Sequence, residues 1–117
     1  MKVTIYHNPR CSKSRQTLEL LKTEGVEPDI IEYLKTPPDK ATLKKILKQL
    51  GLKPRELIRK KEAAYKEAGL DNDNLEDDKL IEAMIENPIL IERPIVLANG
   101  KAAIGRPPDS VLDILRS

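Results

Sequence analysis

Cysteine and histidine each occur once among the 117 residues of this sequence. A single cysteine cannot form an internal disulfide bond, so the composition does not indicate a secreted fold that is stapled by disulfides. One cysteine and one histidine also cannot supply the four ligands of a structural zinc site. We therefore expect neither a disulfide framework nor a bound metal.

Aromatic residues and long apolar stretches are scarce as well. Phe and Trp are absent and Tyr occurs three times, so the core must be aliphatic and no aromatic platform is available for stacking bases. No apolar run approaches about 18 residues, and no signal peptide precedes the first expected strand. The net charge of +2 is small and the two signs are interleaved. These absences predict a cytoplasmic protein that binds neither a membrane nor nucleic acid. We also expect a monomer.

The length suits one domain, and its first third has the pattern of a βαβ unit. The alternating residues 3–5 predict a strand, the apolar spacing of residues 17–21 predicts a helix that stops near Gly25, and residues 29–33 predict a second strand. A strand, helix and strand within about 30 residues imply parallel pairing through a right-handed crossover.

The rest of the chain is predicted to be a helical middle followed by a hairpin and a last helix. One helix begins after residues 36–39, further helices follow over residues 54–87, and the last begins at residues 107–109. Asn99-Gly100 between two apolar runs is a strong hairpin signal, because both residues tolerate positive φ. We therefore expect a single α/β domain over residues 1–117. Its fold is expected to be thioredoxin-like, with a mixed four-stranded sheet flanked by helices and a helical insertion at about 54–87.

Cys11 lies at the junction between the first expected strand and the first expected helix. There the first N–H groups of a helix have no intrahelical partner and, with the helix dipole, favour an anion such as a thiolate. Arg10, Lys13 and Arg15 add positive charge, and His7 would add to it if it folded over the turn. A lone cysteine is often an inert packing residue, but Cys11 has polar and charged neighbours instead of an apolar run. Cys11 is therefore the candidate nucleophile.

Ser14 stands where thioredoxin-like enzymes carry the second cysteine of Cys-x-x-Cys. A dithiol enzyme releases a mixed disulfide with its own second thiol, whereas a covalent intermediate on Cys11 must be resolved by a thiol from outside. Low-molecular-weight phosphatases use Cys-x5-Arg, and the residue six positions after Cys11 is Thr17. The spacing excludes that class.

Three arginines lie near expected junctions, namely Arg59, Arg93 and Arg106. An arginine in such a place is often only a solvated surface residue. Its planar guanidinium is nevertheless the group best suited to hold a tetrahedral oxyanion, since it offers paired donors and stays charged. Arg93-Pro94 directly precedes a strand, and in thioredoxin-like proteins a cis-proline stands at that place and faces the active cysteine.

Four blocks of the sequence together resemble the glutaredoxin-coupled arsenate reductases of the ArsC family, over residues 3–115. The blocks are Tyr6-His7-Asn8-Pro9-x-Cys11-x-x-Ser14-Arg15, Leu57-Ile58-Arg59-Lys60, Arg93-Pro94-Ile95-Val96 and Gly105-Arg106-Pro107. The resemblance implies that Cys11 is the nucleophile and that Arg59, Arg93 and Arg106 bind the oxyanion. It further implies that His7 and Ser14 stabilise the thiolate, that Asn8 contributes to substrate binding and that Pro94 is the cis-proline.

The resemblance implies an enzyme that reduces arsenate, or a similar oxyanion, to arsenite, with glutathione as co-substrate, glutaredoxin as partner and no bound cofactor. Two other functions remain open. The arginines also suit the carboxylates of glutathione, so the enzyme could act on glutathione mixed disulfides. Alternatively, the chain could be a regulator that binds RNA polymerase, like the Spx-like proteins, although these typically use a Cys-x-x-Cys switch that Ser14 removes.

Overall fold

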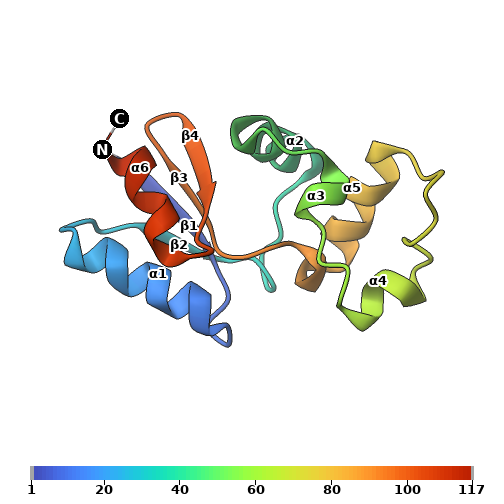
Figure 1. Cartoon of the computed structure of the whole chain (residues 1–117), viewed down its shortest axis with the longest axis horizontal. Coiled ribbons are helices and arrows are strands. Elements are labelled where there is room, and N and C mark those ends of the chain that lie inside the picture. The colour runs from blue at the N-terminus through green and yellow to red at the C-terminus, as the bar shows by residue number, and fades with distance from the viewer. Residues whose placement is uncertain (1, 117) are drawn as a thin grey trace. The chain divides into compact units, whose positions relative to one another are not determined.

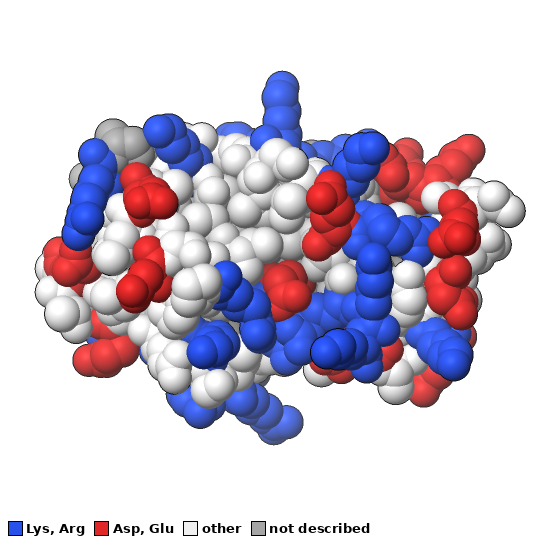
Figure 2. Space-filling view, in the orientation of Figure 1, with Lys and Arg blue, Asp and Glu red and all other residues white. Residues whose placement is uncertain are grey.

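The computed structural model describes residues 2–116, which form two compact units (Figure 1). The first unit comprises the described residues up to Thr36 and from Arg93 onward, and the second comprises Pro37–Glu92. Basic and acidic side chains both occur across the face shown in Figure 2, in keeping with the small net charge. Among the described residues, no helix has the length and apolar character needed to cross a membrane.

The first unit is built on a mixed four-stranded sheet with the strand order β2-β1-β3-β4. Its strands are β1 (Val3–His7), β2 (Asp29–Glu32), β3 (Ile95–Ala98) and β4 (Lys101–Ile104). Strands β1 and β2 pair in parallel, and the other two pairs are antiparallel. Helix α1 (Ser12–Thr23) connects β1 to β2 as the crossover. This is the thioredoxin-like arrangement predicted from the sequence.

The core of the first unit is aliphatic, as the composition predicts. Alternate residues Val3 and Ile5 of β1 are buried together with Leu21 of α1, because successive strand residues point to opposite faces of the sheet. The closing segment, formed by η2 (Pro108–Val111) and α6 (Leu112–Leu115), adds Val111 and Ile114 to the same cluster. This cluster packs α1 and the closing segment against the sheet that carries the candidate site.

The second unit is helical and consists of α2 (Lys40–Leu50), α3 (Pro54–Leu57), α4 (Ala63–Glu67), α5 (Asp77–Glu86) and η1 (Pro88–Leu90). Asp39 caps the start of α2, where its side chain accepts the Thr42 N–H at 2.7 Å, and Gly51 caps its end with a left-handed φ of 70°. It packs against α5, and Lys44 pairs with Asp78 across the two helices at 3.3 Å. The helical unit is therefore wider than the insertion expected over residues 54–87.

Candidate active site

A tight turn between β1 and α1 presents Cys11. The Cys11 N–H donates to the carbonyl oxygen of Asn8 at 3.0 Å, and Pro9 occupies the second turn position, where its fixed φ is favourable. The Asn8 side chain, which is 4% exposed, accepts the Arg10 N–H at 3.0 Å, and Arg15 donates to the Pro9 carbonyl at 2.9 Å. In this structure Asn8 shapes the turn, and its contact with a substrate stays a prediction.

The half-buried sulfur of Cys11 lies at the N-terminal end of α1. Burial raises the pKa of the Cys11 thiol, but the Ser14 N–H, the Arg93 side chain and the Lys13 N–H all stabilise the thiolate, and the net pKa lies below the ordinary value. The Nη2 atom of Arg106 lies 3.5 Å from Sγ. The direction of the shift is the one predicted, since unpaired helix N–H groups and guanidinium groups both favour the anion.

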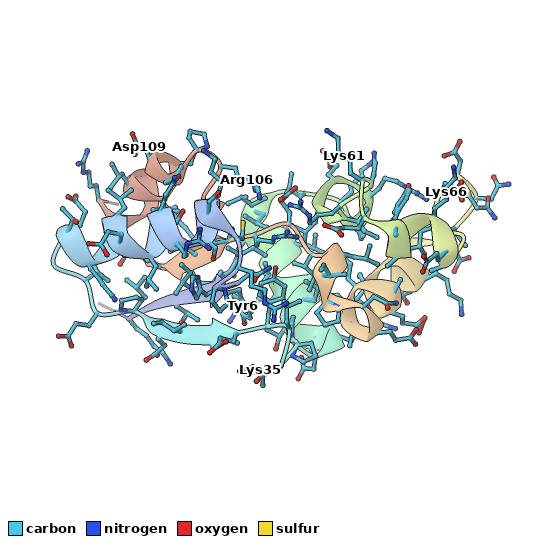
Figure 3. All side chains as sticks on the ribbon, turned by 90° about the horizontal axis from the view of Figure 1, so that it is seen from below. Tyr6, Lys35, Lys61, Lys66, Arg106 and Asp109 are labelled. Atoms are coloured by element: carbon cyan, nitrogen blue, oxygen red, sulfur yellow. The ribbon has the colours of Figure 1, made fainter. Side chains whose placement is uncertain are left out.

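Arg93 and Arg106 reach Cys11 from the two ends of one hairpin. Arg93 precedes β3 and Arg106 follows β4, and Arg106 Nε donates to the Arg93 carbonyl at 2.8 Å. Arg106 lies beside the N-terminal end of α1 (Figure 3). The peptide bond before Pro94 is cis, the geometry that the resemblance implies, and the bond before Pro107 is cis as well, which the sequence analysis did not anticipate.

Gly105 makes a close approach next to these arginines. Its N–H donates to the Pro94 carbonyl at 2.9 Å, and a Cβ built on Gly105 would lie 2.8 Å from Pro94 Cγ and closer still to the Thr17 hydroxyl. No side chain fits there without displacing α1 or the Pro94 loop. The absence of a side chain at residue 105 therefore helps to set the distance between the Cys11 helix and the arginine hairpin.

His7 contacts Ser14 and not the thiol itself. It is 6% exposed, and its Nδ1 lies 2.6 Å from Ser14 Oγ, which also accepts the Asn8 N–H at 3.0 Å. Burial lowers the pKa of His7, Glu32 opposes the shift, and Arg15 adds to it, so the ring is neutral at neutral pH. The lowered pKa disfavours a positive charge on His7, and a role of this residue in stabilising the thiolate stays a prediction. Its contact with the site runs through Ser14, whose N–H lowers the pKa of the Cys11 thiol.

Arg59 belongs to the second unit. Its Nη1 lies 2.6 Å from Glu92 Oε1 and its Nε lies 3.2 Å from Glu62 Oε1. An antiparallel bridge between Ile58 and Ile91 fixes the backbone on both sides of this cluster. Sequence reasoning missed both carboxylates, although one stands three residues after Arg59 and the other directly before Arg93. The participation of Arg59 in an oxyanion site stays a prediction.

No metal centre is visible within residues 2–116, where no three His, Cys, Asp or Glu side chains are grouped so that they could hold an ion. The groups that surround Cys11 are instead guanidinium and backbone N–H donors. Such donors bind anions and do not coordinate cations. The site therefore combines a stabilised thiolate with two guanidinium groups, an arrangement suited to nucleophilic chemistry on an anion.

The sequence and structure of this chain are similar to those of several known proteins. The family model described as "ArsC family" matches residues 6–114. The chain is 60% identical over 114 residues to the uncharacterised protein YfgD of Escherichia coli strain K12, covering 97% of this chain and 96% of YfgD. It is 52% identical over 114 residues to an arsenate reductase of Neisseria meningitidis serogroup A, covering 97% of each.

A comparison with solved structures also finds similarity to an arsenate reductase. The arsenate reductase from Vibrio cholerae superposes with a TM-score of 0.95 at 54% sequence identity, covering 97% of this chain and 98% of that one. The match extends over both units, since the family model runs from β1 into α6. The chain therefore belongs to the ArsC family.

Proposed function

We propose that this protein is an arsenate reductase that forms a covalent arsenic adduct on Cys11, which glutathione and glutaredoxin then resolve. The observation that carries the proposal is the thiolate site itself, in which Arg93 donates to the Cys11 sulfur and Arg106 lies 3.5 Å from it. The names of the relatives from Neisseria meningitidis and Vibrio cholerae support arsenate as the substrate.

Arsenate is a tetrahedral oxyanion that is negatively charged at neutral pH, so it needs donors that stay charged and converge on one point. Arg93 and Arg106 provide two such guanidinium groups from one hairpin, next to the nucleophile. In our proposal Arg59 supplies the third. Binding of the oxyanion by these groups places arsenic next to the sulfur and offsets the repulsion between the thiolate and the anion.

The first chemical step is substitution at arsenic. The Cys11 thiolate forms an S–As bond, an As–O bond breaks, and the oxygen leaves as water after taking up a proton, so arsenic remains As(V). In the second step the glutathione thiolate attacks Sγ of Cys11. The S–S bond forms, the electron pair of the S–As bond stays with arsenic, and arsenite leaves. Two thiols are thus oxidised to one mixed disulfide while As(V) is reduced to As(III).

The mixed disulfide on Cys11 needs a further thiol because the chain has no other cysteine. Glutaredoxin is the proposed partner: its thiolate takes the glutathione moiety by exchange, and Cys11 is released as a thiolate. A thiolate with a lowered pKa is a good leaving group in such an exchange, so the groups that activate Cys11 for attack also favour its release.

A coupled assay tests the proposal. Purified protein is mixed with arsenate, glutathione, glutaredoxin, glutathione reductase and NADPH, and absorbance at the NADPH band is followed. We expect NADPH consumption that needs both arsenate and Cys11, with Cys11→Ser inactive and Ser12→Ala active as the matched control. Equal NADPH consumption by the parent and Cys11→Ser would refute the proposal. Consumption with a glutathione mixed disulfide, but none with arsenate, would assign the enzyme to thiol exchange instead.

A further inference from the structure

The first unit contains a cleft of about 400 Å³ beside the turn that carries Cys11. It lies where the parallel strands β1 and β2 end, and His7 is paired in register with Glu32 there. The carboxyl ends of parallel strands are the usual place for a ligand in an α/β sheet. The residues that line the cleft are His7, Asn8, Pro9, Arg10, Glu32, Leu34 and Lys35.

The charges in this cleft are two positive and one negative. Arg10 and Lys35 carry the positive charges and Glu32 the negative one. Lys35 Nζ lies 3.7 Å from Glu32 Oε1, and the Lys35 side chain is 78% exposed. This ion pair is solvated and weak, so each partner can form an ion pair with a ligand instead. Lys35 is labelled in Figure 3. Leu34, which is 39% exposed, gives the cleft an apolar wall.

We propose that this cleft binds the glutathione that attacks the Cys11 adduct, an inference that rests on the proposed function. Glutathione carries two carboxylates and one ammonium group at neutral pH, the reverse of the two cations and one carboxylate in the cleft. Arg10 and Lys35 bind its carboxylates, Glu32 binds its ammonium group, and Leu34 contacts its aliphatic atoms.

The cleft is near enough to Cys11 for a tripeptide bound there to react. Asn8 lines the cleft, and its carbonyl accepts the Cys11 N–H at 3.0 Å, which makes the two residues the ends of one turn. The Cα atoms at the ends of such a turn are less than about 7 Å apart, whereas a tripeptide spans up to about 10 Å. The bound thiolate then forms the S–S bond with Sγ, and the electron pair of the S–As bond leaves with arsenic.

Binding is tested with S-methylglutathione, which has the charges of glutathione but no thiol that can react. In a titration followed by amide chemical shifts, we expect shifts at residues 7, 8 and 10 and at residues 32–35. Lys35→Glu should weaken binding at least fivefold, because it reverses one of the two cationic partners. Lys101→Glu, which reverses another exposed lysine of the same unit on β4, is the matched control and should bind like the parent.

Kinetics give an independent readout. Lys35→Glu should raise the KM for glutathione at least fivefold while the KM for arsenate stays at the parent value. Resolution of the adduct by 2-mercaptoethanol, which has no charge to be recognised, should not change. Amide shifts confined to the surroundings of Arg93 and Arg106, or unchanged binding in Lys35→Glu, would overturn the proposed cleft. A parent protein without arsenate turnover would overturn the proposed function, and the titration would still decide whether the cleft binds.

Discussion

Replacement of Arg93 should impair arsenate reduction more than replacement of Arg106. The side chain of Arg93 is half-buried and donates to the Cys11 sulfur, whereas Arg106 is exposed and lies 3.5 Å from the same atom. A charge-assisted hydrogen bond contributes about 1.5–3 kcal/mol, and solvent screening places the exposed partner at the lower end of that range. Since about 1.4 kcal/mol corresponds to a factor of ten, Arg106→Ala should lower kcat/KM for arsenate about 10-fold and Arg93→Ala about 100-fold.

The matched lysine variants and a surface control separate charge from geometry. Arg93→Lys and Arg106→Lys should recover only part of the loss, because an ammonium group lacks the paired donors of guanidinium. Arg116→Ala is the control, since this exposed side chain pairs only loosely with Glu24 at 3.8 Å. The measurement is kcat/KM for arsenate, with thermal unfolding of each variant to verify folding. Parent-like kcat/KM in both alanine variants, or the reverse order of the two losses, would refute the reasoning.

Four further outcomes are expected. The alkylation rate of Cys11 should follow a pH profile shifted below that of free cysteine, and an unshifted profile would contradict the lowered pKa. With arsenate and glutathione but no glutaredoxin, mass spectrometry should find one glutathione on Cys11, and Ser14→Cys should diminish this adduct by forming an internal disulfide. The lowered pKa of His7 favours the neutral ring in the folded state, so urea unfolding should show stability falling as pH drops below the ordinary value of 6.5, and His7→Gln should flatten that slope. Gly105→Ala should lower the free energy of unfolding by about 1–3 kcal/mol in the same assay, because the new methyl group would clash with Pro94. An unchanged midpoint of urea unfolding would contradict this, since it would mean that the Pro94 loop moves aside without cost.

Local sequence signals predicted those parts of the fold that depend on a few neighbouring residues. The hairpin follows from Asn99 and Gly100, which have φ values of 54° and 72° and thus adopt the positive φ that the turn requires. The placement of Cys11 at the start of a helix follows equally from the strand and helix patterns on its two sides. Each feature depends only on a few residues that are adjacent in the sequence: the hairpin on its two turn residues, and the position of Cys11 on the boundary between one strand and one helix.

Features that depend on packing between distant segments were not predictable in this way. Arg106 is separated from Cys11 by 95 positions, and only the folded sheet brings the two side chains together. The hydrogen bond between His7 and Ser14 depends on how β1 and α1 pack, and burial then lowers the pKa of the ring. The extent of the helical unit depends on the packing of α2 against α5, which no pattern within α2 encodes.

The hairpin of β3 and β4 has a consequence for the arginines at its open end. Its register pairs Ile95 with Ile104 next to the arginines and Ala98 with Lys101 next to the turn. A slip of one residue would move Arg106 along the strand by about 3.4 Å relative to Arg93 and turn alternate side chains to the other face. The two residues at the tip therefore determine the spacing of two guanidinium groups at the opposite end. A substitution at the tip can therefore alter the proposed anion site without replacing either arginine.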